Sequence, residues 1–212
     1  MNLQFPFRSP FKGGAASPVL SDTMALMMQA LHDKHYQAAK EGRLFIGSAA
    51  AAGTVLPIYS ATAQKFGIWN PAGSGVNANV LGINMTYVDT TGAAGGYVLG
   101  INRNAGSALA TGGISAFTAD TEVDNALSGK LGGNKVRFAP AAATTLAPAL
   151  WRHLGLSQNA FTAAGTDQMA FNLGIKFDGD CIVEPNTAVW LCGNIATLAK
   201  WASTIAWIEE PI

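Results

Sequence analysis

The residues that could bind a metal lie in two places, and neither has the spacing of a known metal motif. His32 and His35 are three residues apart on a predicted helix, so both side chains could face the same way. No Glu lies between them as in a HExxH zinc motif, and no Cys pair is nearby. Asp120, Glu122 and Asp124 alternate as in a calcium loop, but the glycine and final glutamate of an EF-hand are missing. We interpret the histidines as a solvated helix face and the acidic run as a polar loop.

The candidate nucleophiles are two cysteines. Cys181 and Cys192 lie symmetrically about Pro185–Thr187, so a hairpin centred there would place them opposite one another, on the same face as Val183 and Trp190. A disulfide or a reactive thiol is one interpretation of such a pair. Adjacent-strand pairs rarely reach disulfide geometry comfortably, and a thiolate needs a nearby base or cation. The pattern therefore favours two buried, inert cysteines.

The remaining catalytic and phosphate-binding motifs fail on spacing. No serine sits in a GxSxG elbow, and His153 has no sequence-local partner, although a triad built from distant residues stays open. Residues 129–135 lack the spacing of a phosphate-binding loop. The glycines of residues 92–96 lie between two predicted strands and indicate a hairpin turn, and residues 178–180 indicate another turn. The sequence therefore predicts no catalytic, cofactor-binding or metal-binding residue, and a protein that is not an enzyme.

The composition points away from nucleic acid and membrane. Charged residues make up 12% of the 212 residues, about half the usual share, and 13 basic residues balance 13 acidic ones. Affinity for nucleic acid comes largely from Lys and Arg, so no nucleic-acid partner is expected. No apolar run reaches about 18 residues, and no secretory signal is recognised, so we expect a soluble chain made in a reducing cytosol. A neutral surface fits either self-association or an uncharged polar exterior.

Most of the chain is predicted to form strands. Apolar side chains alternate with small or polar ones in four segments, residues 81–87, 97–102, 169–177 and 201–207. Shorter strands are expected at residues 43–48, 55–60, 65–69, 135–138, 151–156, 181–184 and 188–193. Roughly ten strands separated by Gly, Pro and Asn turns predict an all-β fold, a β-sandwich or jelly roll.

An extended arm and one helix are predicted before the strands. Residues 1–20 contain three prolines and three phenylalanines, and the phenylalanines could pack on their own domain or on a neighbouring subunit. Residues 21–41 place Met and Leu side chains at helical spacing, and Gly42 is expected to end the helix. The chain thus divides into residues 1–41, an arm and a helix, and residues 42–212, a β-sandwich domain.

Two internal features complete the organisation. The sequence Val-Leu-Gly-Ile-Asn occurs at residues 80–84 and again at 98–102, which we interpret as two similar strands of one sheet. A solenoid would need more copies than two. Residues 105–133 are rich in Gly, Ala and Thr and predict a long surface excursion.

Two stretches resemble small virion-associated proteins of tailed bacteriophages. The first is Ile68–Asn77, IWNPAGSGVN, followed by the strand at residues 79–88. The second runs from Glu184 to Trp190, EPNTAVW, and on through residues 206–211. The same residues can be explained without a family, as a rigid Asn-Pro turn and a flexible glycine turn between two strands.

The resemblance implies a jelly-roll or sandwich protein on the phage head, a capsid decoration (cement) protein. Its partners would be further copies of itself, in a homo-oligomer with a trimer as the expected form, and a major capsid protein reached through the N-terminal arm. No catalytic residues or cofactors are implied. A carbohydrate- or receptor-binding module of a phage tail or fibre is the first alternative, and it would need two or three of Trp69, Trp151, Trp190, Trp201 and Trp207 exposed as a flat platform. A single-jelly-roll major capsid protein is the second.

Overall fold

The computed structural model describes eight segments of the chain. These are residues 35–63, 65–89, 92–103, 123–127, 133–144, 146–158, 172–196 and 198–212. The predicted arm, most of the predicted helix and nearly all of the predicted excursion at 105–133 lie outside them. Residues 38–212 belong to one compact unit.

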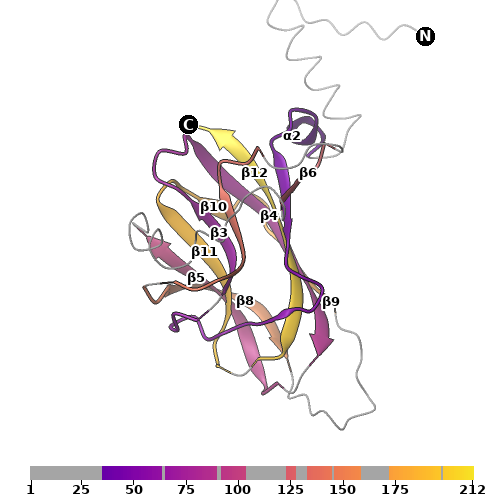
Figure 1. Cartoon of the computed structure of the whole chain (residues 1–212), viewed down its shortest axis with the longest axis vertical. Coiled ribbons are helices and arrows are strands. Elements are labelled where there is room, and N and C mark those ends of the chain that lie inside the picture. Colours follow the sequence, from indigo (N-terminus) through magenta and orange to yellow (C-terminus); the bar gives the residue numbers. More distant parts are fainter. Residues whose placement is uncertain are drawn as a thin grey trace, which may run out of the picture. The chain divides into compact units, whose positions relative to one another are not determined.

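Apart from one short helix, the regular elements of the described chain are strands, arranged in two antiparallel sheets (Figure 1). The seven-stranded sheet contains β1 (Leu44–Ser48), β2 (Thr54–Val55), β4 (Val76–Asp89), β6 (Val123–Asn125), β9 (Asn172–Lys176), β10 (Ile182–Val183) and β12 (Lys200–Pro211). The five-stranded sheet contains β3 (Lys65–Asn70), β5 (Gly95–Arg103), β7 (Arg137–Ala142), β8 (Ala149–Gln158) and β11 (Thr187–Gly193). The all-β prediction is confirmed. Strands β4, β5, β9 and β12 cover the described parts of the four alternating segments apart from Phe177, and β5 is buried on both faces from Tyr97 to Asn102.

Strand pairing is nested around the middle of the chain. β1 pairs with β12, β3 with β11, β4 with β9 and β10, and β5 with β8, so early strands pair with late ones in mirrored order. Two further pairings, of β12 with β4 and of β11 with β5, join the nested pairs into two sheets. The strand orders that result are β10-β4-β12-β1-β6 and β7-β3-β11-β5-β8.

The main core lies between the two sheets. Strand β12 shows the cause: its residues alternate between half-buried and buried, so one row of side chains faces inward. Aromatic rings from both sheets meet there, with Tyr97 of β5 edge-on to Trp201 of β12 at 5.6 Å, and Phe138 of β7 stacked on Trp207 at 6.5 Å. Gly47 of β1 leaves room for the Phe138 ring, since a Cβ there would lie 2.6 Å from it.

The short helix α2 (Tyr36–Lys40) ends as predicted at Gly42. Gly42 has a φ of +71°, and its N–H donates to the Ala39 carbonyl at 3.0 Å. The Arg43 N–H donates to the Ala38 carbonyl at 2.9 Å. This pair of bonds is the Schellman arrangement, which satisfies helix carbonyls and favours glycine at the left-handed position. In the described segments no helix is long and apolar enough to cross a membrane.

Three predictions about connections are wrong. The repeated strands at 80–84 and 98–102 lie in β4 and β5, which belong to different sheets. Gly95 and Gly96 are therefore part of β5, and the connection from β4 crosses between sheets without forming a hairpin. Residues 55–60 form no full strand, because the chain leaves β2 after Val55 and makes only an isolated bridge from Ile58 to Gly193. Alternating apolar residues indicate that a segment is a strand with one buried face. They do not indicate which of the two sheets contains that strand.

Candidate functional site

The predicted cysteine hairpin is also wrong, although the thiols are buried. β10 pairs with β4 in one sheet, whereas β11 pairs with β3 and β5 in the other, so the turn at Pro185–Thr187 crosses between sheets. Cys181 packs in the main core, and Cys192 packs with Trp190 in a second cluster. The two cysteines are free and buried, as the preferred interpretation held.

Burial decides the chemistry of both thiols. It raises the pKa of Cys181 to about 12 and that of Cys192 to about 12, because a thiolate would lose its hydration. We expect both thiols to resist an aromatic disulfide reagent at pH 8 in the folded protein and to react at once in denaturant. Rapid reaction of either thiol in the native state would contradict the burial described here.

The same shifts predict how stability depends on pH. The folded state holds the thiol protons more tightly than the unfolded chain, whose thiol pKa is near 9. The stabilisation that comes from keeping both buried thiols protonated is therefore complete below pH about 9. It is lost as the pH rises toward about 12. Urea midpoints measured at pH 8, 10 and 11 should fall, and replacing both cysteines by alanine should flatten the decline.

The second cluster lies on the outer face of the five-stranded sheet. Its members are Val98, Ala139, Ala188, Trp190 and Cys192, with Tyr59 and Trp69 packed against them. Lys65 of β3 is also fully buried, and its ammonium donates to the carbonyls of Ala61 and Ala63. Burial lowers the pKa of Lys65, and the nearby Cys192 group acts in the opposite direction. This buried amine was not predictable from the sequence, because it lies in a strand whose other face packs in the main core.

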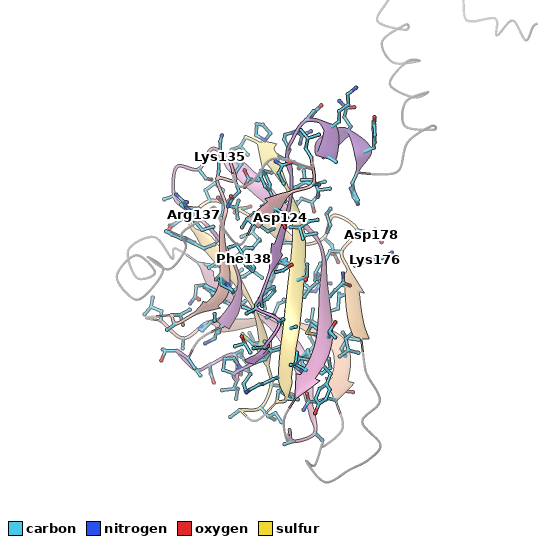
Figure 2. All side chains as sticks on the ribbon, turned by 45° about the vertical axis from the view of Figure 1, so that its right-hand side comes forward. Asp124, Lys135, Arg137, Phe138, Lys176 and Asp178 are labelled. Carbon is cyan, nitrogen blue, oxygen red and sulfur yellow. The ribbon has the colours of Figure 1, made fainter. Side chains whose placement is uncertain are left out.

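The residues that were weighed and set aside as metal ligands, together with His153, do not come together in the described segments. His153 is exposed on β8, and His35 is half-buried beside α2. Asp124 is exposed on β6 (Figure 2). His32, Asp120 and Glu122 lie outside the described residues. Within those residues, no group of three or more His, Cys, Asp or Glu side chains could hold an ion. Asp178–Asp180 form the predicted turn between β9 and β10, with Gly179 at a φ of +87°.

Asn70 joins two turns at one end of the molecule. It ends β3 and is fully buried, and its side-chain amide donates to the Val76 carbonyl at 2.7 Å and to the Val183 carbonyl at 2.9 Å. The backbone N–H of Asn186 donates to the Asn70 carbonyl at 2.7 Å. Asn186 takes a φ of +66°, a left-handed conformation that asparagine tolerates better than most residues. The turn after β3 and the turn before β11 are thus fixed to each other.

A cavity of about 350 Å³ opens beside these turns. Ile101, Trp151 and Ile182 form its apolar side, and Arg103, Glu184 and Thr187 line it with polar groups. Ile182 is 46% exposed because it lies on the outward side of β10, whose other residue, Val183, is buried. The cavity is a candidate for a binding site in the described part of the chain.

The five tryptophans do not form the flat platform that a sugar-binding face would need. Trp190, Trp201 and Trp207 are at most 1% exposed. Trp69 and Trp151 are half-buried, but they lie on β3 and β8, and β11 and β5 separate those strands. We expect blue-shifted tryptophan emission, with acrylamide quenching that is removed mainly by changing Trp69 and Trp151 to Phe. Strong quenching in that double variant would mean that the three core rings are accessible.

Searches against protein-family models, curated proteins and solved structures find no match to this chain.

Proposed function

We propose that this chain is a capsid decoration (cement) protein of a tailed bacteriophage, a non-enzymatic structural protein that acts as a homo-oligomer. The observation that carries the proposal is the meeting of the two stretches that resemble such proteins. Residues 68–77 and 184–190 are far apart in the chain, yet β3 and β11 pair over Phe66–Asn70, and Asn70 fixes both turns. Sequence features that share one structural unit support a common origin better than scattered matches do.

The nested strand order supports the finer part of the proposal, a jelly roll. A jelly roll is a double-sheet fold in which a long antiparallel hairpin is wound up. Nested pairing of β1 with β12, β3 with β11, β4 with β9 and β5 with β8 is what such winding produces. Viral shell domains and lectin domains both use this fold. The strand order therefore supports the jelly-roll architecture, whereas the proposed decoration role rests on the sequence resemblance.

The proposed mechanism is stabilisation by binding. A protein that binds the assembled shell and not its separated subunits shifts the equilibrium toward the shell by mass action. Such a role needs a large contact surface that is complementary to the shell. It makes no use of a reactive side chain. The buried and protonated thiols, and a formal net charge of zero that leaves self-association unopposed, fit this role.

Quantitative mass spectrometry of purified particles tests the proposal. We expect this chain at a copy number comparable to that of the shell protein, and we expect particles without it to lose their genome at a lower temperature. Absence from the particle would overturn the proposal. A few copies per particle would indicate a tail or fibre module, and identity with the major shell band would indicate a capsid protein.

A further inference from the structure

We propose that the cavity of about 350 Å³ beside Trp151 binds one pyranose ring of a saccharide. The Trp151 indole packs against the apolar face of the sugar, and Arg103 and Glu184 bond its hydroxyl groups. The volume lies at the lower end of the roughly 300–1,000 Å³ typical of small-molecule sites, so it suits a single ring. One ring needs one aromatic side chain and no platform of several tryptophans. The inference goes beyond the proposed function and does not depend on it.

A β-bulge in β8 directs Trp151 into the cavity. Arg152 pairs with Leu99 of β5 and Leu150 pairs with Gly100, so Trp151 between them has no partner of its own in β5. A bulge inserts one extra residue in this way and redirects its side chain. Leu150 is 40% exposed, whereas Trp151 packs against the main core and lines the cavity. Trp151 is only half-buried, which leaves part of it open to a ligand.

Contacts between the sheets hold the walls of the cavity in place. Arg152, next to Trp151, donates to the Asp180 carboxylate at 3.0 Å, and its guanidinium lies 5.5 Å from the centre of the Phe177 ring. The wall formed by residues 184–187 is held by Asn70, whose amide donates to the Val183 carbonyl at 2.9 Å. A site with fixed walls loses less conformational entropy when its ligand enters.

Three polar side chains supply the hydrogen-bonding groups of the cavity. Arg103 of β5 and Thr187 of β11 are paired residues, so their side chains are neighbours. Each lies two residues from a main-core side chain of its own strand, Ile101 or Val189, and faces the same way. Glu184 follows β10 of the other sheet. Among the described residues, neither Arg103 nor Glu184 forms an ion pair or a side-chain hydrogen bond.

These polar groups select the class of ligand. An arginine only donates hydrogen bonds and a carboxylate only accepts them, so the ligand must accept at Arg103 and donate at Glu184. A hydrocarbon would desolvate both charged groups without giving them a partner, which is costly. Glu184 would repel a simple anion, and Arg103 would repel a simple cation. Hydroxyl groups both donate and accept, and a pyranose ring combines them with an apolar C–H face for the indole.

A zwitterionic amino acid is the nearest competing ligand. Its two charged groups are attached to a single carbon atom, so the protein groups that bind them must lie close together. Arg103 ends β5 of one sheet and Glu184 follows β10 of the other, and these two described residues form no ion pair with each other. The hydroxyl groups of a sugar are distributed around its ring and can reach partners on different sides. The arrangement therefore favours the sugar.

Titration of the full-length chain with single sugars tests the proposal. Glucose, galactose, mannose and N-acetylglucosamine are added in turn, with free leucine as the zwitterionic probe. Two-dimensional NMR follows the indole N–H signals of the five tryptophans, and the Trp151 signal is identified by its loss in Trp151→Phe. We expect at least one sugar to shift the Trp151 signal saturably, with a dissociation constant on the order of 1 mM.

Substitutions at exposed charges locate the site without disturbing the core. Arg103→Ala and Glu184→Ala each remove one bonding group from an exposed residue and should weaken sugar binding about tenfold. Glu210→Ala is the matched control, because Glu210 is also exposed but does not line the cavity, and its affinity should equal that of the unchanged chain. Sugar binding that is unchanged in both cavity variants would overturn the location.

The remaining outcomes concern the ligand class and the proposed function. No shift of the Trp151 signal with any of the four sugars would overturn the saccharide assignment. A shift with leucine alone would overturn it as well and would indicate a site for zwitterions. Either result leaves the decoration role to its own test on particles, and absence of the chain from particles would leave sugar binding by the purified chain unaffected.

Discussion

Changing Gly67 to alanine is expected to lower the free energy of unfolding by about 4 kcal/mol, a large part of the total for a single domain. Gly67 lies in β3, opposite Trp190 of β11 and Ala139 of β7. A Cβ at this position would lie 2.1 Å from the carbonyl oxygen of Val189 and 2.9 Å from the Trp190 ring. Backbone atoms cannot rotate out of the way as a side-chain tip can, so the strands must separate.

The magnitude follows from what that separation breaks. Overpacking a core typically costs about 1–3 kcal/mol and sometimes more. Moving β3 from β11 also weakens one or two ladder hydrogen bonds, each contributing about 1 kcal/mol. Trp190 is fully buried, and its indole N–H donates to the side-chain oxygen of Asn102 at 2.7 Å, so a shift of β11 disturbs that bond as well.

The matched control is Gly96→Ala in β5 of the same sheet. There the nearest atom to an added Cβ is the side-chain nitrogen of Asn194 at 3.3 Å, and the nearest backbone atom is the Leu156 carbonyl oxygen at 3.6 Å. The Asn194 side chain can move, so we expect a loss below about 1 kcal/mol. Urea denaturation of both variants provides the comparison. Equal losses would show that β3 and β11 are not as close as described.

The sequence was most informative where one physical constraint acted alone. In β12 the alternation of Trp201, Ser203, Ile205 and Trp207 reflects one buried face, and the strand follows directly. The Schellman end at Gly42 was likewise predictable, because few residues other than glycine adopt that conformation easily. Local chemistry therefore located individual strands and helix ends well.

Connectivity was not predictable in the same way. A turn between two alternating segments looks identical whether it closes a hairpin or crosses to the other sheet, and the turns before β5 and before β11 both cross. The cysteine pairing failed for that reason. β11 also departs from alternation, because Ala188, Trp190 and Cys192 are buried on its outer face while Val189 and Leu191 enter the main core.

The candidate site was partly predictable. Asn70 and the glycine turn that follows it were recognised as a turn, but the bond from Asn70 to the Val183 carbonyl depends on a residue 113 positions away. The cavity beside Trp151 likewise combines side chains from three distant segments. Buried polar groups such as Lys65 and Glu209 look like ordinary surface charges in a sequence, because their partners are backbone atoms that carry no sequence signal.

Changing Glu209 to alanine is expected to lower the free energy of unfolding by about 3 kcal/mol. Glu209 lies near the end of β12 and is 5% exposed. Its carboxylate accepts the backbone N–H of Lys135 at 2.9 and 3.0 Å and that of Val136 at 2.9 Å, with the Trp207 indole N–H at 3.4 Å. These bonds fix the chain that enters β7 of one sheet to β12 of the other.

The expected loss of stability arises mainly from the backbone N–H groups of Lys135 and Val136, which would be left without an acceptor. A hydrogen bond to a charged group contributes about 1.5–3 kcal/mol, and an unsatisfied buried N–H costs about 1–3 kcal/mol. Alanine removes every acceptor at once, whereas water that enters the space would satisfy part of the loss. The individual terms therefore do not add, and about 3 kcal/mol is the expected net effect.

Glu209→Gln separates the bonds from the packing. Glutamine keeps the side-chain length and one acceptor oxygen, but its amide nitrogen would face a backbone N–H, so roughly half of the alanine effect should remain. Thermal unfolding gives the stability of both variants, and hydrogen exchange at Val136 reports the bond itself. Faster exchange at Val136 in the alanine variant, with an intermediate rate in the glutamine variant, is the expected order. Unchanged exchange at Val136 in both variants would mean that Glu209 does not hold the entry to β7.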